Sequence, residues 1–153
     1  MGKKRQKGPK WVPSRKDLEK ILEVDNKHEL FLVGHVCIER MFDKILEKKF
    51  GIPFKLDEPQ LMWKQKELML KHSGLLKGEV KGNVKRINEI RSRYAHILKP
   101  NEEYIVSLIN KLVIIDAPAG EESRARIGTK FERYRVCVIS TFTALEKIFE
   151  KID

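Results

Sequence analysis

Apolar residues spaced three and four apart constrain this chain most, because that spacing places them on one face of an α-helix. The clearest such stripe lies between residues 79 and 98 and consists of Val80, Val84, Ile87, Tyr94 and Leu98. Four residues after Ile87 the stripe reaches Arg91, a charged side chain where the pattern requires an apolar one. We therefore expect a core-facing helix that carries one arginine on its buried side. That arginine should have either a structural partner or a functional role.

The end of this helix is set by Pro100, which disfavours helical geometry at the residue before it. The helix should therefore end between His96 and Leu98, so that His96 lies in its last turn. There the helix dipole favours a protonated imidazole. The same helix also carries the basic residues Lys85, Arg86 and Arg93, and a basic run of this kind is most often a solvated helix face.

Similar spacing and cap residues indicate further helices along the chain. Ser14 and Asn26 are typical N-cap residues, each followed three positions later by an acid, and Gly51 is a typical helix stop. The expected helices cover 14–24, 26–50, 57–71, 79–98, 101–112 and 129–152. Residues 113–115 resemble a strand but have no neighbour to pair with, and 116–128 reads as a polar loop. The sequence predicts an all-α bundle of five to six helices, with the second, fourth and last at its centre.

Length and charge indicate one domain and a basic leader. The 153 residues are enough to bury one core without disulfides or metal. The net charge is +10, and seven basic residues precede the first acid, Asp17. We expect residues 1–13 to be a flexible leader, either an inert solubilising tail or a non-specific phosphate binder, and 14–153 to be a single helical domain.

The cellular compartment follows from what the sequence lacks and from its cysteines. The sequence shows no secretory signal and no apolar run that approaches 18 residues, so we expect a cytoplasmic protein with no membrane partner. Cys37 and Cys137 lie within apolar helical runs and follow no metal-ligand spacing. They are therefore expected to be reduced and buried.

Three potential metal ligands, His28, His35 and Glu39, fall near one face of the second helix. Helical bundles that bind metals take carboxylates and histidines from several helices, and only this partial set is present, so we predict no metal and no cofactor. Glu39 lies among apolar residues and needs a partner. The natural candidate is Arg91, the other charge on a core-facing stripe.

The spacing Arg91-x4-His96 resembles the R-x(4-6)-H motif of the HEPN superfamily, all-helical domains that include metal-independent ribonuclease toxins. Its flanks, residues 71–76 and 87–96, resemble the mannitol-operon-repressor branch of that superfamily. The resemblance covers about residues 28 to 152. One departure is Ser92, since many members have asparagine directly after the motif arginine.

The geometry of a regular helix separates the two motif residues. Five positions correspond to about 140° around the axis, so Arg91 and His96 cannot point into one site from an unbroken helix. Either the helix breaks or a second copy supplies the partner. The resemblance implies the latter, a two-fold homodimer whose two motifs form a composite cleft.

The resemblance also implies roles for the site residues. Arg91 would hold the scissile phosphate, His96 would move the proton, and Ser92 would add a hydrogen bond. Lys85, Arg86 and Arg93 would attract RNA, while Glu39 and Tyr94 would support the site. The implied function is a metal-independent endoribonuclease, a toxin held in check by a cognate antitoxin or regulatory partner.

Two alternatives stay open beside this hypothesis. The first is a non-catalytic regulatory or scaffold protein of the mannitol-repressor type, in which Arg91 pairs with Glu39 and His96 caps the helix end. The second is a basic RNA-binding module without turnover. The position of Arg91, in an open cleft or buried beside Glu39, distinguishes these readings.

Overall fold

The described residues form an all-helical bundle. The computed structural model describes residues 12–51, 61–97, 99–116 and 130–153, and these form six helices without a strand. The expectations for most of the leader, for the helix start at Asp57 and for the loop at 116–128 fall on residues 1–11, 52–60 and 117–129, which lie outside the described part.

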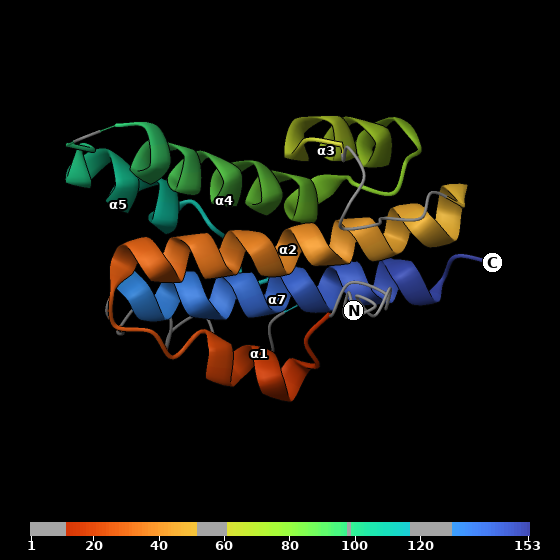
Figure 1. Cartoon of the computed structure of the whole chain (residues 1–153), viewed down its shortest axis with the longest axis horizontal. Helices are drawn as coiled ribbons and strands as arrows, with labels where there is room; N and C mark the ends of the chain where they lie inside the picture. Colours follow the sequence, from red (N-terminus) through yellow and green to blue (C-terminus); the bar gives the residue numbers. More distant parts are fainter. Residues whose placement is uncertain (1–11, 52–60, 98, 117–129) are drawn as a thin grey trace, which may run out of the picture.

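Two long helices run side by side through the middle of the molecule (Figure 1). They are α2 (Lys27–Phe50) and α7 (Lys130–Glu150). Helix α4 (Gly78–His96) packs on α2 from one side, and α1 (Arg15–Ile21) packs on α7 from the other. The central position of these three long helices confirms the prediction from their apolar stripes.

The cap residues act as their sequence positions predict. The side chains of Ser14 and Asn26 accept hydrogen bonds from the backbone N–H groups three positions later, at the starts of α1 and α2. Asn101 does the same for α5 (Glu102–Asn110). Gly51 ends α2 with a φ of 67°, a left-handed conformation that glycine adopts without steric cost.

The third helix differs from its prediction. Helix α3 comprises Trp63–His72, and the two described residues before it, Leu61 and Met62, are not helical. The expected continuous helix from Asp57 is therefore wrong at this point. The helix starts at Trp63 because the Gln65 side chain accepts a hydrogen bond from the backbone N–H of Met62 at 2.8 Å, which caps the first turn.

The apolar segment after α5 has no regular secondary structure and forms no strand. Its backbone groups are satisfied by a buried side chain, because the Asn83 amide donates to the Val113 carbonyl at 2.7 Å and accepts from the Val113 N–H at 2.9 Å. Asn83 also donates to Thr141 on α7. One asparagine of α4 therefore supplies the pairing that a neighbouring strand would otherwise provide.

The core lies between α2, α4 and α7. The rings of Tyr134 and Phe31, both buried, pack edge to face there with centroids 4.8 Å apart. Cys37 and Cys137 are buried free thiols, as expected, and burial raises the pKa of each to about 11. In the described part of the chain, no helix combines the length and apolarity needed to cross a membrane.

Arg135 and Arg133 of α7 donate hydrogen bonds to backbone carbonyls at the C-terminal ends of neighbouring helices. The Arg135 guanidinium donates to the carbonyls of Leu22 and Val24, which follow α1. Arg133 donates in the same way to carbonyls at the end of α5. Arg135, which interrupts the apolar line of the last helix in the sequence, is therefore satisfied inside the monomer.

Candidate functional site

Helix α4 is continuous from Gly78 to His96, so it does not bend between the two motif residues. The Ile97 N–H still bonds to the Arg93 carbonyl at 3.1 Å, which keeps the last turn regular. Arg91 is half-buried toward α2, whereas His96 is exposed at the helix end. Of the two explanations for the motif, a break in the helix is therefore wrong, and within one copy the two side chains lie about 140° apart around the axis.

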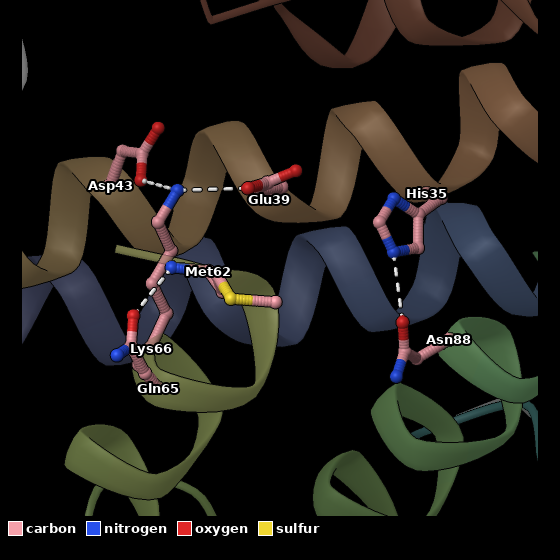
Figure 2. A network of polar contacts seen from close by, with 7 residues as sticks. All are labelled: His35, Glu39, Asp43, Met62, Gln65, Lys66 and Asn88. Atoms are coloured by element: carbon pink, nitrogen blue, oxygen red, sulfur yellow. Dashed lines mark hydrogen bonds and ion pairs between the residues drawn. The ribbon is translucent and has the colours of Figure 1, made fainter. Parts of the chain in front are cut away.

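Glu39 does not pair with Arg91, which corrects the expectation from the sequence. Its carboxylate instead accepts from the Lys66 ammonium at 2.8 Å, and Lys66 also binds Asp43 at 2.7 Å (Figure 2). Lys66 is 1% exposed and comes from α3. The two carboxylates lie one helical turn apart on α2, so a single lysine can bridge them.

The pairing of Glu39 with Lys66 leaves Arg91 without a counter-ion. Within the described part of the chain, the Arg91 side chain has no ion pair and no hydrogen bond, and its Nε atom is buried without an acceptor. A buried donor without a partner costs about 1–3 kcal/mol. The buried Nε is out of reach of a ligand, so an anion could bind only through the other nitrogens of the guanidinium, which also have no partner in the described chain.

His35 lies between α3 and α4 and contacts both. Its ring stacks on Trp63 with centroids 4.0 Å apart, and its Nε2 lies 3.0 Å from the Asn88 side-chain oxygen (Figure 2). An amide oxygen only accepts hydrogen bonds, so Nε2 carries the proton. Desolvation lowers the pKa of His35, opposed by the Asn88 hydrogen bond and by Glu39, and assisted by Arg91 and Lys66. The ring is therefore neutral at physiological pH.

The other predicted site residues divide between two sides of α4. Lys85, Ser92 and His96 are seven and four positions apart, so they share one strip of the helix, which lies about 100–140° around the axis from Arg91. Arg93 lies on the side that faces α5, where it covers the Tyr104 ring at 4.7 Å. It also lies 3.8 Å from Glu89. Arg93 is thus already engaged and is not beside Arg91.

Arg86 also lies away from Arg91. Its guanidinium approaches the backbone at Gly82, where an added Cβ would be 3.1 Å from Arg86 Nη1. The helix periodicity puts Arg86 on the same side as Arg93, almost opposite Arg91. Of the three basic residues expected to attract RNA, only Lys85 therefore borders the strip with Ser92 and His96.

Tyr94 fixes the C-terminal half of α4 in place. Its hydroxyl donates to the Glu102 carboxylate at 2.9 Å, and its ring packs on His28 and Phe31 of α2. The Lys27 ammonium also binds Glu102 at 2.7 Å. These contacts join α4 to the starts of α2 and α5, which is the supporting position expected for Tyr94.

The three potential metal ligands of α2 each contact a different residue. His28 packs on Tyr94, His35 bonds to Asn88, and Glu39 binds Lys66. Across the residues that the structure describes, no group of three or more histidine, cysteine, aspartate and glutamate side chains gathers where it could hold a metal ion.

Sequence reasoning missed Lys66, Trp63 and Asn88. Their signal was present but incomplete, because Glu39 and Asp43 form a pair of acids at helical spacing, and such a pair on a core-facing stripe calls for a cation. Nothing within one helix says which residue of another helix will face it.

Comparison with family models, curated proteins and solved structures finds no match for this chain.

Proposed function

We propose that this chain is a metal-independent endoribonuclease of HEPN type that acts as a two-fold homodimer. The observation that carries the proposal is the Arg91 guanidinium, which has no ion pair or hydrogen bond in the described chain although it borders a buried region. A fully charged group in that position is suited to bind an anion. RNA presents such an anion at every phosphodiester, and the exposed Lys85, farther around the same helix, adds long-range attraction.

The chemistry uses the RNA itself as nucleophile. The 2'-oxygen attacks the adjacent phosphorus, a bond forms between them, and the bond from phosphorus to the 5'-oxygen breaks. Arg91 binds the phosphate oxygens and stabilises the charge that develops on them. His96 takes the proton from the 2'-hydroxyl while water protonates the leaving 5'-oxygen, or His96 protonates the 5'-oxygen while water takes the 2' proton, since an imidazole serves as base or acid. The products are a 2',3'-cyclic phosphate and a 5'-hydroxyl.

The dimer is part of the proposal because one copy does not bring the two groups together. Arg91 and His96 lie about 140° apart on a continuous helix. In a two-fold dimer, the same surface meets itself, so the His96 of one copy can approach the Arg91 of the other. Tyr94 and its contacts with Glu102 would then hold the rigid helix end that presents His96.

The second candidate is RNA binding without turnover. It is favoured by one observation, the separation of Arg91 from His96 within a single copy, because phosphate binding needs Arg91 alone. The regulatory alternative loses its expected ion pair, since Glu39 binds Lys66. A toxin would in addition require a partner that blocks the site, such as a cognate antitoxin.

The test is incubation of the purified protein with a mixed RNA pool in EDTA. We expect fragments with 2',3'-cyclic phosphate ends, and we expect Arg91→Ala and His96→Ala to abolish them. Arg15→Ala on α1 and His72→Ala at the end of α3 are matched controls on exposed side chains and should cleave as the wild type does. If folded wild-type protein binds RNA and leaves it intact, the second candidate replaces the first. If it neither binds nor cleaves RNA, both are wrong and a regulatory role is favoured.

A further inference from the structure

Asn88 is a polar residue of α4 that has no role in the proposed reaction. It lies one turn before Arg91, and residues three apart on a helix are neighbours on its surface. Its side chain is half-buried, and its oxygen accepts the hydrogen bond from His35 Nε2 at 3.0 Å. The orientation of this amide is therefore set by a residue of another helix.

The orientation leaves the Asn88 nitrogen available. Figure 2 shows the oxygen facing His35 and the nitrogen turned the other way. Within the described chain, that nitrogen makes no hydrogen bond. An amide nitrogen carries two N–H donors, so Asn88 presents two unused donors beside the unpaired guanidinium of Arg91.

His35 is itself held firmly. It is 6% exposed, stacks on Trp63, and remains neutral because burial lowers its pKa. In this arrangement the proton on Nε2 and the oxygen of Asn88 match as donor and acceptor, which leaves the Asn88 nitrogen on the side away from His35.

We propose that Asn88 is a second ligand of the phosphate at Arg91, and that His35 positions it. The inference rests on the proposed function, because the phosphate is that of RNA. Asn88 donates to one phosphate oxygen while Arg91 donates to the others.

The experiment measures binding of an oligoribonucleotide with 2'-O-methyl groups, which cannot be cleaved. We expect Asn88→Ala to bind about tenfold more weakly, the order expected for one hydrogen bond to a charged group. Asn88→Asp keeps the acceptor for His35 and replaces the donors by a negative oxygen, so it should bind more weakly still. Asn110→Asp, an exposed site at the end of α5, is the matched control for charge and should bind as the wild type does.

An NMR readout separates a ligand from a remote structural effect. The Asn88 side-chain amide signals, assigned by their loss in Asn88→Asp, should move when the oligonucleotide is added to the wild type. If binding depends on Arg91 but Asn88→Asp and the amide signals are unaffected, the inference is overturned and the proposed function stands. If the wild type does not bind, or binds independently of Arg91, the proposed function fails and this inference fails with it.

Discussion

At the scale of single residues, two basic side chains that face α2 differ in whether they have carboxylate partners. Lys66 is buried and bridges Glu39 and Asp43, whereas Arg91 is half-buried and has no partner within the described chain. Breaking a buried ion pair by removing one partner is costly because it leaves an uncompensated charge. Removing a cation that has no partner avoids that cost. The two residues should therefore respond differently to the same substitution.

We predict that Lys66→Met lowers the free energy of unfolding by about 3–5 kcal/mol, because it leaves the two carboxylates without their shared cation. Arg91→Met should leave stability unchanged or raise it by about 1–2 kcal/mol, because it removes a buried donor without an acceptor. Urea unfolding of both variants measures this. Equal losses in the two proteins would contradict the account, since Arg91 would then have a stabilising partner of its own.

His35 makes stability depend on pH in a defined direction. Its pKa is lower in the folded protein than the ordinary value of 6.5, mainly because burial disfavours the charged ring. The unfolded chain therefore binds the proton more readily, and the free energy of unfolding should fall as pH decreases below 6.5 toward the folded pKa. From about one pH unit above 6.5, the ring is neutral in both states and the contribution is constant.

The test compares the wild type with His35→Gln, which can still donate to Asn88 but does not titrate. Urea unfolding at about pH 7.5, 6.5 and 5.5 should show a steeper loss for the wild type than for the variant across the acidic interval. Parallel curves would show that His35 titrates normally in the folded protein, and that it is not the buried neutral group described above.

At the scale of helices, α2 and α7 pack tightly where Gly34 meets Tyr134. A Cβ atom added at Gly34 would lie 2.5 Å from the Tyr134 hydroxyl oxygen and 3.1 Å from two atoms of its ring. Tyr134 is fully buried, so its ring cannot move away. Gly34 is thus required by packing and not by backbone conformation.

We predict that Gly34→Ala destabilises the protein by about 1–3 kcal/mol through overpacking, although alanine is the better helix former. Gly82→Ala in α4 is the matched control. Its added Cβ would meet only the flexible end of Arg86, so this variant should be more stable by about 0.5–1 kcal/mol. Thermal unfolding distinguishes the two, and a stabilised Gly34→Ala would contradict the described packing of α2 on α7.

These elements also show what the sequence could predict. The cap residues Ser14, Asn26 and Gly51 and the apolar stripes located five of the helices, because those signals are local to each helix. The stripe also identified Arg91 as the exceptional residue. Its partner was assigned wrongly, since the choice between Arg91 and Lys66 for Glu39 depends on how α3 lies against α2. Helical periodicity gives the face of a residue but not which residue of another helix it meets.

At the scale of the whole molecule, the proposed active site requires a second copy of the chain. One chain presents Arg91 and His96 on different sides of α4, and the proposed site forms only where two such helices meet. Arg133, Arg135 and Asn83 make their hydrogen bonds to backbone carbonyls within one copy, and the proposed dimer is required by the site.

The most direct test mixes the Arg91→Ala and His96→Ala proteins and measures cleavage of RNA in EDTA. If each site takes Arg91 from one copy and His96 from the other, random exchange makes half of the dimers mixed, and each mixed dimer has one intact site. The mixture should therefore recover about a quarter of the wild-type rate, while each variant alone is inactive. An active wild type with no recovery in an exchanged mixture would contradict the composite site, and an inactive wild type would contradict the ribonuclease itself.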